Sequence, residues 1–286
     1  MDYLSRFSRV VMAISVGVCV LFGYMVCQSI FPMAFVFVAS FFCGGSETAA
    51  MDVYTRHMAD VYLVSSLFFA ACLIAALLIY RKVKKSHFTD FLMKPKTKEL
   101  PLFLLGAFFL GITMNLGLSN LISLLPVPQQ WIADNAESVN AFSKSSLWVM
   151  LLAQSIAAPI VEELIFRGVL YHGLRRAPVA SNRILCVGIS AVAVSGVFGW
   201  IHGNILQALY CFCFSLILIW LVEATGSIWG AVVAHVGFNS SWVLRIFIGW
   251  WYDSTAYLLN SVLFLIMSAV LMLFTLWAGG MRFRKK

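Results

Sequence analysis

Long apolar runs dominate the sequence and decide which kinds of fold it can adopt. About eight stretches are long enough, at about 20 residues each, to cross the hydrocarbon core of a bilayer as a helix. Hydrophobic residues make up 62% of the 286 residues and charged residues only 11%, which excludes an ordinary soluble domain. The sequence therefore predicts an all-α, polytopic transmembrane helix bundle. The runs lie near residues 10–31, 61–80, 102–123, 147–172, 184–201, 205–222, 227–249 and 257–277.

The first apolar run is unusually long and contains a proline. It extends from Val10 to Cys43 and is interrupted by Pro32. Since proline removes a backbone donor and kinks helices, we expect either one tilted helix broken near Pro32 or a span followed by a re-entrant segment. Arg6 and Arg9 precede the run, as in a signal sequence, but no small-residue cleavage site follows. We therefore expect the first span to be retained.

Basic residues concentrate in alternate connections between the predicted spans and at both ends of the chain. With eight spans, these segments all fall on one side of the membrane, so the positive-inside rule predicts cytoplasmic termini in a multi-pass protein of the cell membrane. The net charge of +8 reflects this distribution, and we expect no nucleic-acid partner. The residues concerned are Arg6, Arg9, Arg81, Lys82, Lys84, Lys85, Lys94, Lys96, Lys98, Arg175, Arg176, Arg183, Arg282, Arg284, Lys285 and Lys286, whereas Arg56, Lys144 and Arg245 fall on the other side.

The cysteines do not form a recognisable framework. There are seven, an odd number, scattered mostly within apolar runs and without a C-x-x-C pair. This distribution predicts packing residues and argues against a disulfide scaffold or a cysteine metal site.

Two adjacent carboxylates, Glu162 and Glu163, lie inside the fourth apolar run. An ionised side chain at bilayer depth costs at least about 2.5–3.5 kcal/mol, so such residues usually mark a functional site. Glu163 and Arg167 are four residues apart and share a helical face, which predicts an internal ion pair. Glu162 lies about 100° further round the helix and is left for another role. A structural salt bridge alone would explain one Glu and one Arg, but it needs no second glutamate. Pro159 is expected to bend this span.

Few other ionisable groups occur in the later spans. His202 follows Phe198 by four residues, and His235 precedes Asn239 by four, so each pair shares a helical face. A lone histidine in an apolar helix is more often a hydrogen-bonded core residue than a catalyst. Three spans that each contribute polar groups favour a shared site, and nearby glycines are expected to allow close helix contact. These glycines are Gly196, Gly199, Gly203, Gly226, Gly230 and Gly237.

This set of side chains suits hydrolysis. A buried carboxylate, Glu162, can take a proton from water with the help of His202, and His235 and Asn239 can donate hydrogen bonds to an oxyanion. The alternative is a zinc site, since Glu162, His202 and His235 match the three protein ligands of a catalytic zinc. No HExxH pattern supports zinc, however.

The three motifs, Glu162-Glu163-xxx-Arg167, Phe198-xxx-His202 and His235-xxx-Asn239, resemble in type and order those of the CPBP family. This family comprises CAAX proteases and bacteriocin-processing enzymes and is also called the Abi family. The resemblance covers about Leu147 to Arg245. It implies that Glu162 and His202 activate water, that His235 and Asn239 stabilise an oxyanion, and that Glu163, Arg167 and Phe198 support the site. It also favours a glutamate mechanism without a metal cofactor, with zinc as the alternative.

The resemblance further implies an organisation and a class of substrate. We expect an N-terminal transmembrane region of about three spans with a basic cytoplasmic loop (1–146), a catalytic helical core (147–250), and a last span with a basic tail (251–286). The expected partners are membrane lipid and a peptide or membrane-anchored protein substrate. Eukaryotic members of the family remove the last three residues of prenylated proteins, but the motifs do not require a prenylated substrate.

Two other classes of function are compatible with buried polar groups. In a non-catalytic scaffold or bacteriocin-immunity protein, the same residues would form a polar network that fixes helix packing. A proton-coupled transporter also uses buried carboxylates, but the sequence has no half-to-half symmetry or paired broken helices that would favour one.

Overall fold

A computed structural model of the chain describes residues 3–85, 87–93, 97, 99–177, 179–180, 182–248 and 257–278. Over these residues the fold is built from helices, without a strand, which confirms the predicted all-α class. The basic residues Lys94, Lys96, Lys98, Arg282, Arg284, Lys285 and Lys286, which the topology prediction used, lie outside the described residues. None of the cysteines, all of which are described, forms a disulfide.

Seven of the described helices are long and apolar enough to cross a membrane, and seven of the eight expected spans correspond to them. The remaining expected span, 227–249, corresponds to α11, which is helical over 20 residues but is not among the seven. The seven extend over Phe7–Phe42, Met58–Lys84, Leu100–Ile122, Leu147–Arg176, Arg183–Trp200, Ile205–Thr225 and Leu258–Thr275.

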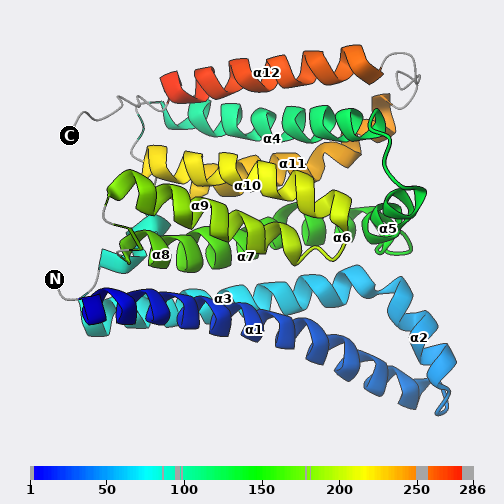
Figure 1. Ribbon diagram of the computed structural model, residues 1–286. Helices are drawn as coiled ribbons and strands as arrows, with labels where there is room; N and C mark the ends of the chain where they lie inside the picture. The colour runs from blue at the N-terminus through cyan, green and yellow to red at the C-terminus, as the bar shows by residue number, and fades with distance from the viewer. Residues whose placement is uncertain are drawn as a thin grey trace. The chain divides into compact units, whose positions relative to one another are not determined.

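The helices follow one another in the order shown in Figure 1. Short 3-10 and π-helical segments join some of them, at His87–Leu92, Leu151–Ala157 and Leu164–Tyr171. The α-helices are α1 (Tyr3–Phe42), α2 (Glu47–Arg56), α3 (Met58–Lys84), α4 (Leu100–Ser123), α5 (Gln129–Asn140), α6 (Leu147–Met150), α7 (Ala158–Glu163), α8 (His172–Arg176), α9 (Arg183–Trp200), α10 (Ile205–Thr225), α11 (Trp229–Ile248) and α12 (Tyr257–Ala278).

The chain forms two compact units, each made from two separate stretches of sequence. The first unit consists of Met1–His87 and Ala136–Val179, and the second of Phe88–Asn135 and Ala180–Lys286. In the first unit, α1 and α3 pack against each other and against the helical segments between α6 and α8. In the second unit, α4 packs between α11 and α12, and α10 packs against α9 and α11.

The first helix is continuous where we expected a break. α1 passes through Pro32 without interruption and ends at Phe42, so neither the broken helix nor the re-entrant segment is formed. Proline is tolerated in membrane helices when a neighbouring helix supports the segment, and α3 packs along α1.

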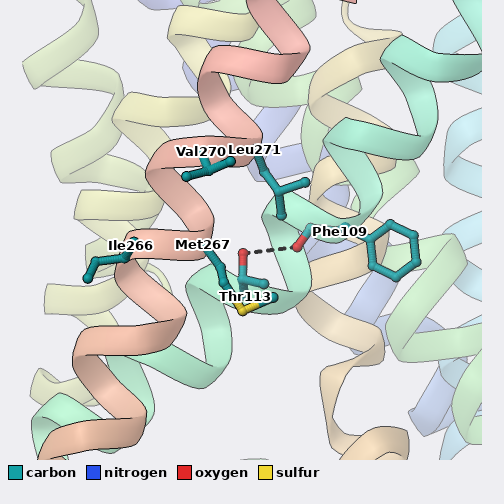
Figure 2. A pocket seen from close by; sticks show the side chains of 6 residues that line it. All are labelled: Phe109, Thr113, Ile266, Met267, Val270 and Leu271. Atoms are coloured by element: carbon teal, nitrogen blue, oxygen red, sulfur yellow. Dashed lines mark hydrogen bonds between the residues drawn. The ribbon is translucent and has the colours of Figure 1, made fainter.

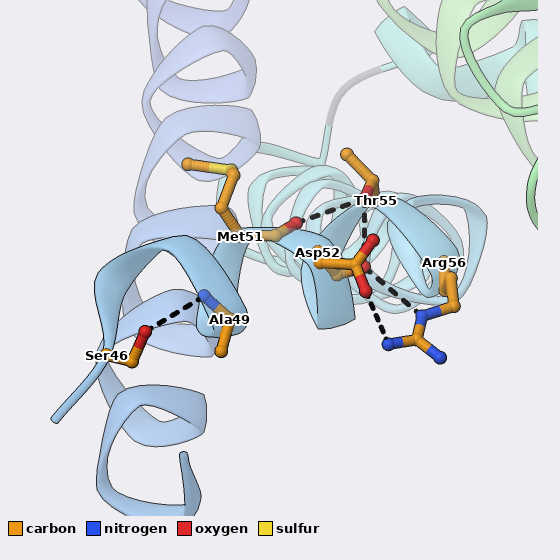
Figure 3. Close-up of polar contacts among 6 residues, drawn as sticks. All are labelled: Ser46, Ala49, Met51, Asp52, Thr55 and Arg56. Atoms are coloured by element: carbon orange, nitrogen blue, oxygen red, sulfur yellow. Dashed lines mark hydrogen bonds and ion pairs between the residues drawn. The ribbon is translucent and has the colours of Figure 1, made fainter. Parts of the chain in front are cut away.

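The connection from α1 to α3 contains a helix that the apolar pattern did not predict. Gly44 and Gly45 adopt positive φ angles of 62° and 82° and turn the chain. The hydroxyl of Ser46 then accepts a hydrogen bond from the backbone N–H of Ala49 at 3.3 Å and caps α2 (Figure 3). Asp52 and Arg56 form an ion pair of 2.6 Å on the exposed face of the same helix (Figure 3).

Glycines allow α4 and α11 to pack backbone against backbone in the second unit. A Cβ atom at Gly111 would meet the carbonyl oxygen of Ala234, and one at Gly237 would meet the carbonyl oxygen of Phe108. Close contact through glycine was expected for membrane helices, and Gly199 and Gly230 also lie at helix contacts. Three of the glycines expected at helix contacts are not found there. Gly203 and Gly226 have positive φ angles of 78° and 70° in turns, and a Cβ atom at Gly196 would meet no atom of another segment within 4 Å.

The start of α11 is tied to the 3-10 segment that precedes α4. The backbone N–H of Ile228 donates to the carbonyl of Phe91 at 3.0 Å, and the indole Nε1 of Trp229 donates to the carbonyl of Leu92 at 2.9 Å. These bonds anchor the N-terminal end of the helix that carries His235 and Asn239.

The α4 and α12 helices are joined by a small polar contact next to an apolar groove. Thr113 donates to the carbonyl of Phe109 at 3.0 Å, and Ser268 donates to the hydroxyl of Thr113 at 2.8 Å. The groove has a volume of about 300 Å³ (Figure 2). It is lined by Phe109, Thr113, Ile266, Met267, Val270 and Leu271.

Candidate active site

The helical stretch that carries the two glutamates is not a regular α-helix. Between α6 and α8 the backbone widens into a π-helix at Leu151–Ala157, returns to α-helix at α7, and widens again at Leu164–Tyr171. Pro159, at the start of α7, explains the first wide segment, because its ring would clash with the carbonyl four residues earlier in a regular helix. Glu162 and Glu163 therefore end a short α-helix flanked by two π-helical segments, a local geometry that is frequent at functional sites.

Glu163 and Arg167 form the ion pair that their spacing predicted. The Oε1 atom of Glu163 lies 2.8 Å from Nη1 of Arg167, and the exposed fraction of both side chains is 0%. Residues on both sides of the arginine, from Leu164 to Tyr171, are also buried. Because a buried charge without its partner is strongly destabilising, each of the two residues requires the other.

Glu162 has different surroundings from its neighbour. Its side chain is partly exposed, whereas that of Glu163 is fully buried. The adjacent carboxylates thus differ in environment: Glu163 is bound to Arg167 in a buried pair, and Glu162 is partly exposed.

A polar cluster that the sequence did not single out lies between α1 and α3. Tyr24 and Tyr62 are hydrogen-bonded through their hydroxyl groups at 2.9 Å. Gln28 donates to Ser66 at 3.0 Å and accepts from Ser65 at 2.7 Å. The available signal was the spacing: Tyr24 and Gln28 are four residues apart on one predicted span, as are Tyr62 and Ser66 on the next.

In the second unit, Phe198 brings His202 and His235 together. The centroid of its ring lies 5.0 Å from that of His202 and 5.8 Å from that of His235, both in an edge-on arrangement. His202 lies in the turn after α9, which ends at Trp200, and its Nδ1 is 2.7 Å from the carbonyl oxygen of Phe198. A carbonyl can only accept, so Nδ1 carries the proton in this hydrogen bond. In the neutral ring, Nε2 is therefore the basic nitrogen.

His235 is enclosed by aromatic rings from two other helices. Only 3% of its surface is exposed, and the ring of Phe214 on α10 lies 5.7 Å away, in addition to that of Phe198 on α9. Phe214 stacks on Phe238 at 4.1 Å, which closes the aromatic cluster. Asn239 follows His235 by one turn of α11 and is partly exposed. The motifs did not include Phe214 or Phe238, because their contact with His235 depends on how the helices pack.

The predicted site residues thus form two sets. Glu162, Glu163 and Arg167 belong to the first unit, and a second set from α9, α11 and the turn after α9 belongs to the second. The first set offers a carboxylate, and the second offers an imidazole with a basic Nε2 together with imidazole and amide donors. Over the described residues, neither unit by itself gathers three His, Cys, Asp or Glu side chains that could hold a metal ion. The second set consists of Phe198, His202, His235 and Asn239.

Two comparisons with known proteins found similar sequences. Residues 144–241 match the family model described as "Type II CAAX prenyl endopeptidase Rce1-like", a region that contains both sets of site residues. The curated protein "Putative membrane peptidase YdiL" of Bacillus subtilis (strain 168) is 25% identical over 199 residues, which is 70% of this chain and 75% of that protein. No solved structure matches the chain. The matched region, the relative and the membrane-spanning helices together make this chain similar to membrane peptidases of the CAAX prenyl endopeptidase type.

Proposed function

We propose that the chain is an intramembrane endopeptidase in which Glu162 and His202 activate the attacking water. The observation that carries this proposal is the difference between the two adjacent glutamates. Glu163 is bound to Arg167 at 2.8 Å in a fully buried pair, whereas Glu162 is partly exposed. A general base must be reachable by water, and of the two adjacent glutamates Glu162 is the one with that access.

In this mechanism the water loses a proton as it attacks the carbonyl carbon of the scissile bond. Glu162 accepts the proton, with Nε2 of His202 sharing the work, and the proton is then delivered to the leaving amine. The bond between Nδ1 of His202 and the Phe198 carbonyl, at 2.7 Å, supports this role because it leaves Nε2 basic. His235 and Asn239 donate to the oxyanion, and the aromatic enclosure of His235 strengthens such a donor by excluding water.

We propose that Glu163 and Arg167 fix the backbone around Glu162 and take no part in the proton transfers. Their ion pair joins α7 to the π-helical segment that follows, and both side chains are fully buried. Glu162 is then held between the buried ion pair on one side and the widened segment before Pro159 on the other.

The proposed substrate is a peptide or a membrane-anchored protein. We also propose that both termini of the protease are cytoplasmic. The substrate class rests on the family, whose matched model is named for prenyl endopeptidases. The orientation rests on the basic residues on one side of the predicted spans. We favour a glutamate mechanism over zinc. The reason is chemical: Nε2 of His202 and the carboxylate of Glu162 supply the bases that hydrolysis needs.

The test is cleavage of a membrane-peptide library by wild type, Glu162→Gln and Glu47→Gln in one detergent, with thermal melts of each. Glu47→Gln is the matched control, because it makes the same chemical change on α2, outside the predicted spans. We expect Glu162→Gln to melt like wild type and to lose turnover, and Glu47→Gln to behave like wild type in both. A chelator should leave the wild-type rate unchanged.

Two outcomes would contradict the proposal. If folded wild type cleaves nothing while another family member cleaves the library, the scaffold alternative is favoured. If the chelator abolishes cleavage and zinc restores it, Glu162, His202 and His235 are to be reassigned as zinc ligands.

A further inference from the structure

Tyr210 on α10 is joined by aromatic contacts to the enclosure of His235. The centroid of its ring lies 6.1 Å from that of Phe238. Phe238 stacks on Phe214 at 4.1 Å, and the ring of Phe214 lies 5.7 Å from that of His235. All four residues belong to the second unit. The ring of Tyr210 is therefore held by the same cluster that keeps water away from His235.

The hydroxyl of Tyr210 makes a hydrogen bond to a different helix. It donates to the amide oxygen of Asn135 on α5, at 3.4 Å, and Asn135 also belongs to the second unit. The usual separation between a hydroxyl donor and an oxygen acceptor is about 2.7–2.8 Å, so this hydrogen bond is long and weak. Both residues are partly exposed. The hydroxyl thus has an acceptor that another acceptor can replace.

The helix that carries Asn135 is loosely held. α5 has 12 residues, and most of those whose burial is described are exposed. Among the described residues, α5 packs only weakly against any other helix. One of its polar contacts is internal, since the side chain of Gln130 donates to that of Asp134 at 2.6 Å. Moving α5 away from Tyr210 would therefore disturb little packing.

Asn135 supplies an acceptor of the same chemistry as a peptide bond. A side-chain carboxamide and a backbone amide both present a carbonyl oxygen that accepts hydrogen bonds. The O–H of a tyrosine can therefore donate to either. A peptide substrate that displaces the carboxamide of Asn135 would find a donor that is already in place, because the ring of Tyr210 is held against Phe238.

The position of Tyr210 along α10 suits a peptide that binds beside His235. Tyr210 precedes Phe214 by one turn, which is about 6 Å along the helix axis. An extended peptide advances about 3.3–3.6 Å per residue, so about two residues cover this distance. A substrate whose scissile bond lies beside His235 would then present a nearby backbone carbonyl to the Tyr210 hydroxyl.

We propose that the Tyr210 hydroxyl is a substrate-binding donor for a backbone carbonyl of the peptide, and that Asn135 on α5 is its internal competitor. This inference rests on the proposed function, since it takes a peptide as the substrate of the second set of site residues. The competing explanation is a structural tether, in which the same hydrogen bond only fastens α5 to α10.

The experiment measures peptide binding without turnover. The full chain carries Glu162→Gln in one detergent, and the probe is the fluorescently labelled peptide of the membrane-peptide library that binds it most tightly, followed by anisotropy. Tyr210→Phe and Asn135→Ala are added to this chain separately and together. Tyr54→Phe is the matched control, because Tyr54 also makes an aromatic contact, to Phe35 at 6.1 Å, but lies on α2 in the first unit.

The two variants should shift the Kd of the peptide in opposite directions. Tyr210→Phe keeps the ring and removes the donor, so we expect the Kd to rise by about 3- to 10-fold. Asn135→Ala removes the competing acceptor, so the Kd should fall by about 2- to 5-fold. In the double variant the change at Asn135 should have no effect of its own, and Tyr54→Phe should leave the Kd unchanged.

A structural tether predicts a different pattern, because Tyr210→Phe and Asn135→Ala break the same hydrogen bond. Shifts of the Kd in the same direction, or no shift for either variant, would overturn the proposal. Thermal melts show whether each variant folds. If Tyr210→Phe does not fold, Asn135→Ala decides alone, and binding that is unchanged or weaker overturns the proposal.

Cleavage kinetics separate this inference from the proposed function. With Glu162 intact, Tyr210→Phe should raise KM and Asn135→Ala should lower it, with kcat changed by less than about twofold, because the donor contributes to binding. If the Kd shifts in opposite directions but wild type cleaves nothing, the binding role of Tyr210 stands and the protease function fails. If wild type cleaves but both variants shift the Kd in the same direction, the protease function stands and the binding role fails.

Discussion

Glu163 and Arg167 are four residues apart in sequence, and both side chains are fully buried. Oε1 of Glu163 lies 2.8 Å from Nη1 of Arg167. Asp52 and Arg56 have the same spacing and a shorter separation of 2.6 Å, but their side chains are 60% exposed. The two pairs are therefore alike in sequence geometry and opposite in environment, which makes them natural controls for each other.

Breaking the buried pair should cost far more stability than breaking the exposed one. Arg167→Met leaves the carboxylate of Glu163 buried without its cation, and we expect a loss of about 3–5 kcal/mol in the free energy of unfolding. Arg56→Met should change it by about 0–1 kcal/mol. Unfolding by denaturing detergent measures both. The double change Glu163→Gln with Arg167→Met should recover part of the loss, and equal costs for the two single arginine changes would contradict a buried pair.

Two Gly→Ala changes, one at the α4–α11 contact and one on α9, should have opposite effects on stability. Gly237→Ala pushes a Cβ atom against the carbonyl of Phe108, and we expect a loss of about 1–3 kcal/mol. Gly196→Ala adds a methyl group where no neighbour lies within 4 Å, in the middle of α9, and should stabilise the helix by about 0.5–1 kcal/mol. Thermal melts of the two variants should move in opposite directions, and a stabilising Gly237→Ala would show that α4 and α11 are further apart.

The proposal that Glu162 and His202 activate the same water predicts that the effects of changing them are not additive. Each single change, Glu162→Gln or His202→Ala, should lower kcat by at least about 10²-fold, since general base catalysis contributes that much. The double variant should be little worse than either single one, because residues that act together are not additive. Single-turnover kinetics on the best library peptide gives the three rates. Losses that multiply would indicate that the two residues serve separate steps.

The π-helical turn before α7 predicts an effect of Pro159→Ala on activity without loss of stability. Alanine restores the N–H and removes the ring that prevents a regular turn, so the segment can relax toward an α-helix and rotate Glu162. We expect kcat to fall by about 10-fold or more, as small displacements of catalytic groups do, with a melting temperature equal to or above that of wild type. Unchanged kcat with unchanged stability would mean that the wide turn does not position Glu162.

Spacing along the chain predicted the local parts of this structure. The Glu163–Arg167 pair joins residues four apart within one helical stretch, whose geometry brings such residues together. His202 also meets the residue four before it, Phe198, but from the turn that follows α9. The apolar runs predicted eight spans, and seven of them correspond to described helices long and apolar enough to cross a membrane, because bilayer thickness sets the length of a spanning helix.

Contacts between distant segments could not be predicted in this way. Phe214 meets His235 only because α10 packs against α11, and Tyr24 meets Tyr62, 38 residues away, only because α1 packs against α3. The continuity of α1 through Pro32 also depends on its neighbour. A proline in the sequence shows that a backbone donor is missing, but it does not show which helix compensates for the loss.

The uninterrupted course of α1 has a consequence for the lipid around the protein. At about 1.5 Å per residue, its 40 residues extend about 60 Å, roughly twice the hydrocarbon thickness of a bilayer. A tilt of about 60° would be needed to fit this length within the hydrocarbon core, which is beyond the range of about 0–40° that membrane helices adopt. Phe37, Phe41 and Phe42 near its end are 65%, 70% and 88% exposed, so they extend into the headgroup layer or draw the bilayer up around them. The fit between this helix and the bilayer therefore depends on acyl-chain length, and vesicles of long-chain lipids should accommodate the helix better than those of short-chain lipids.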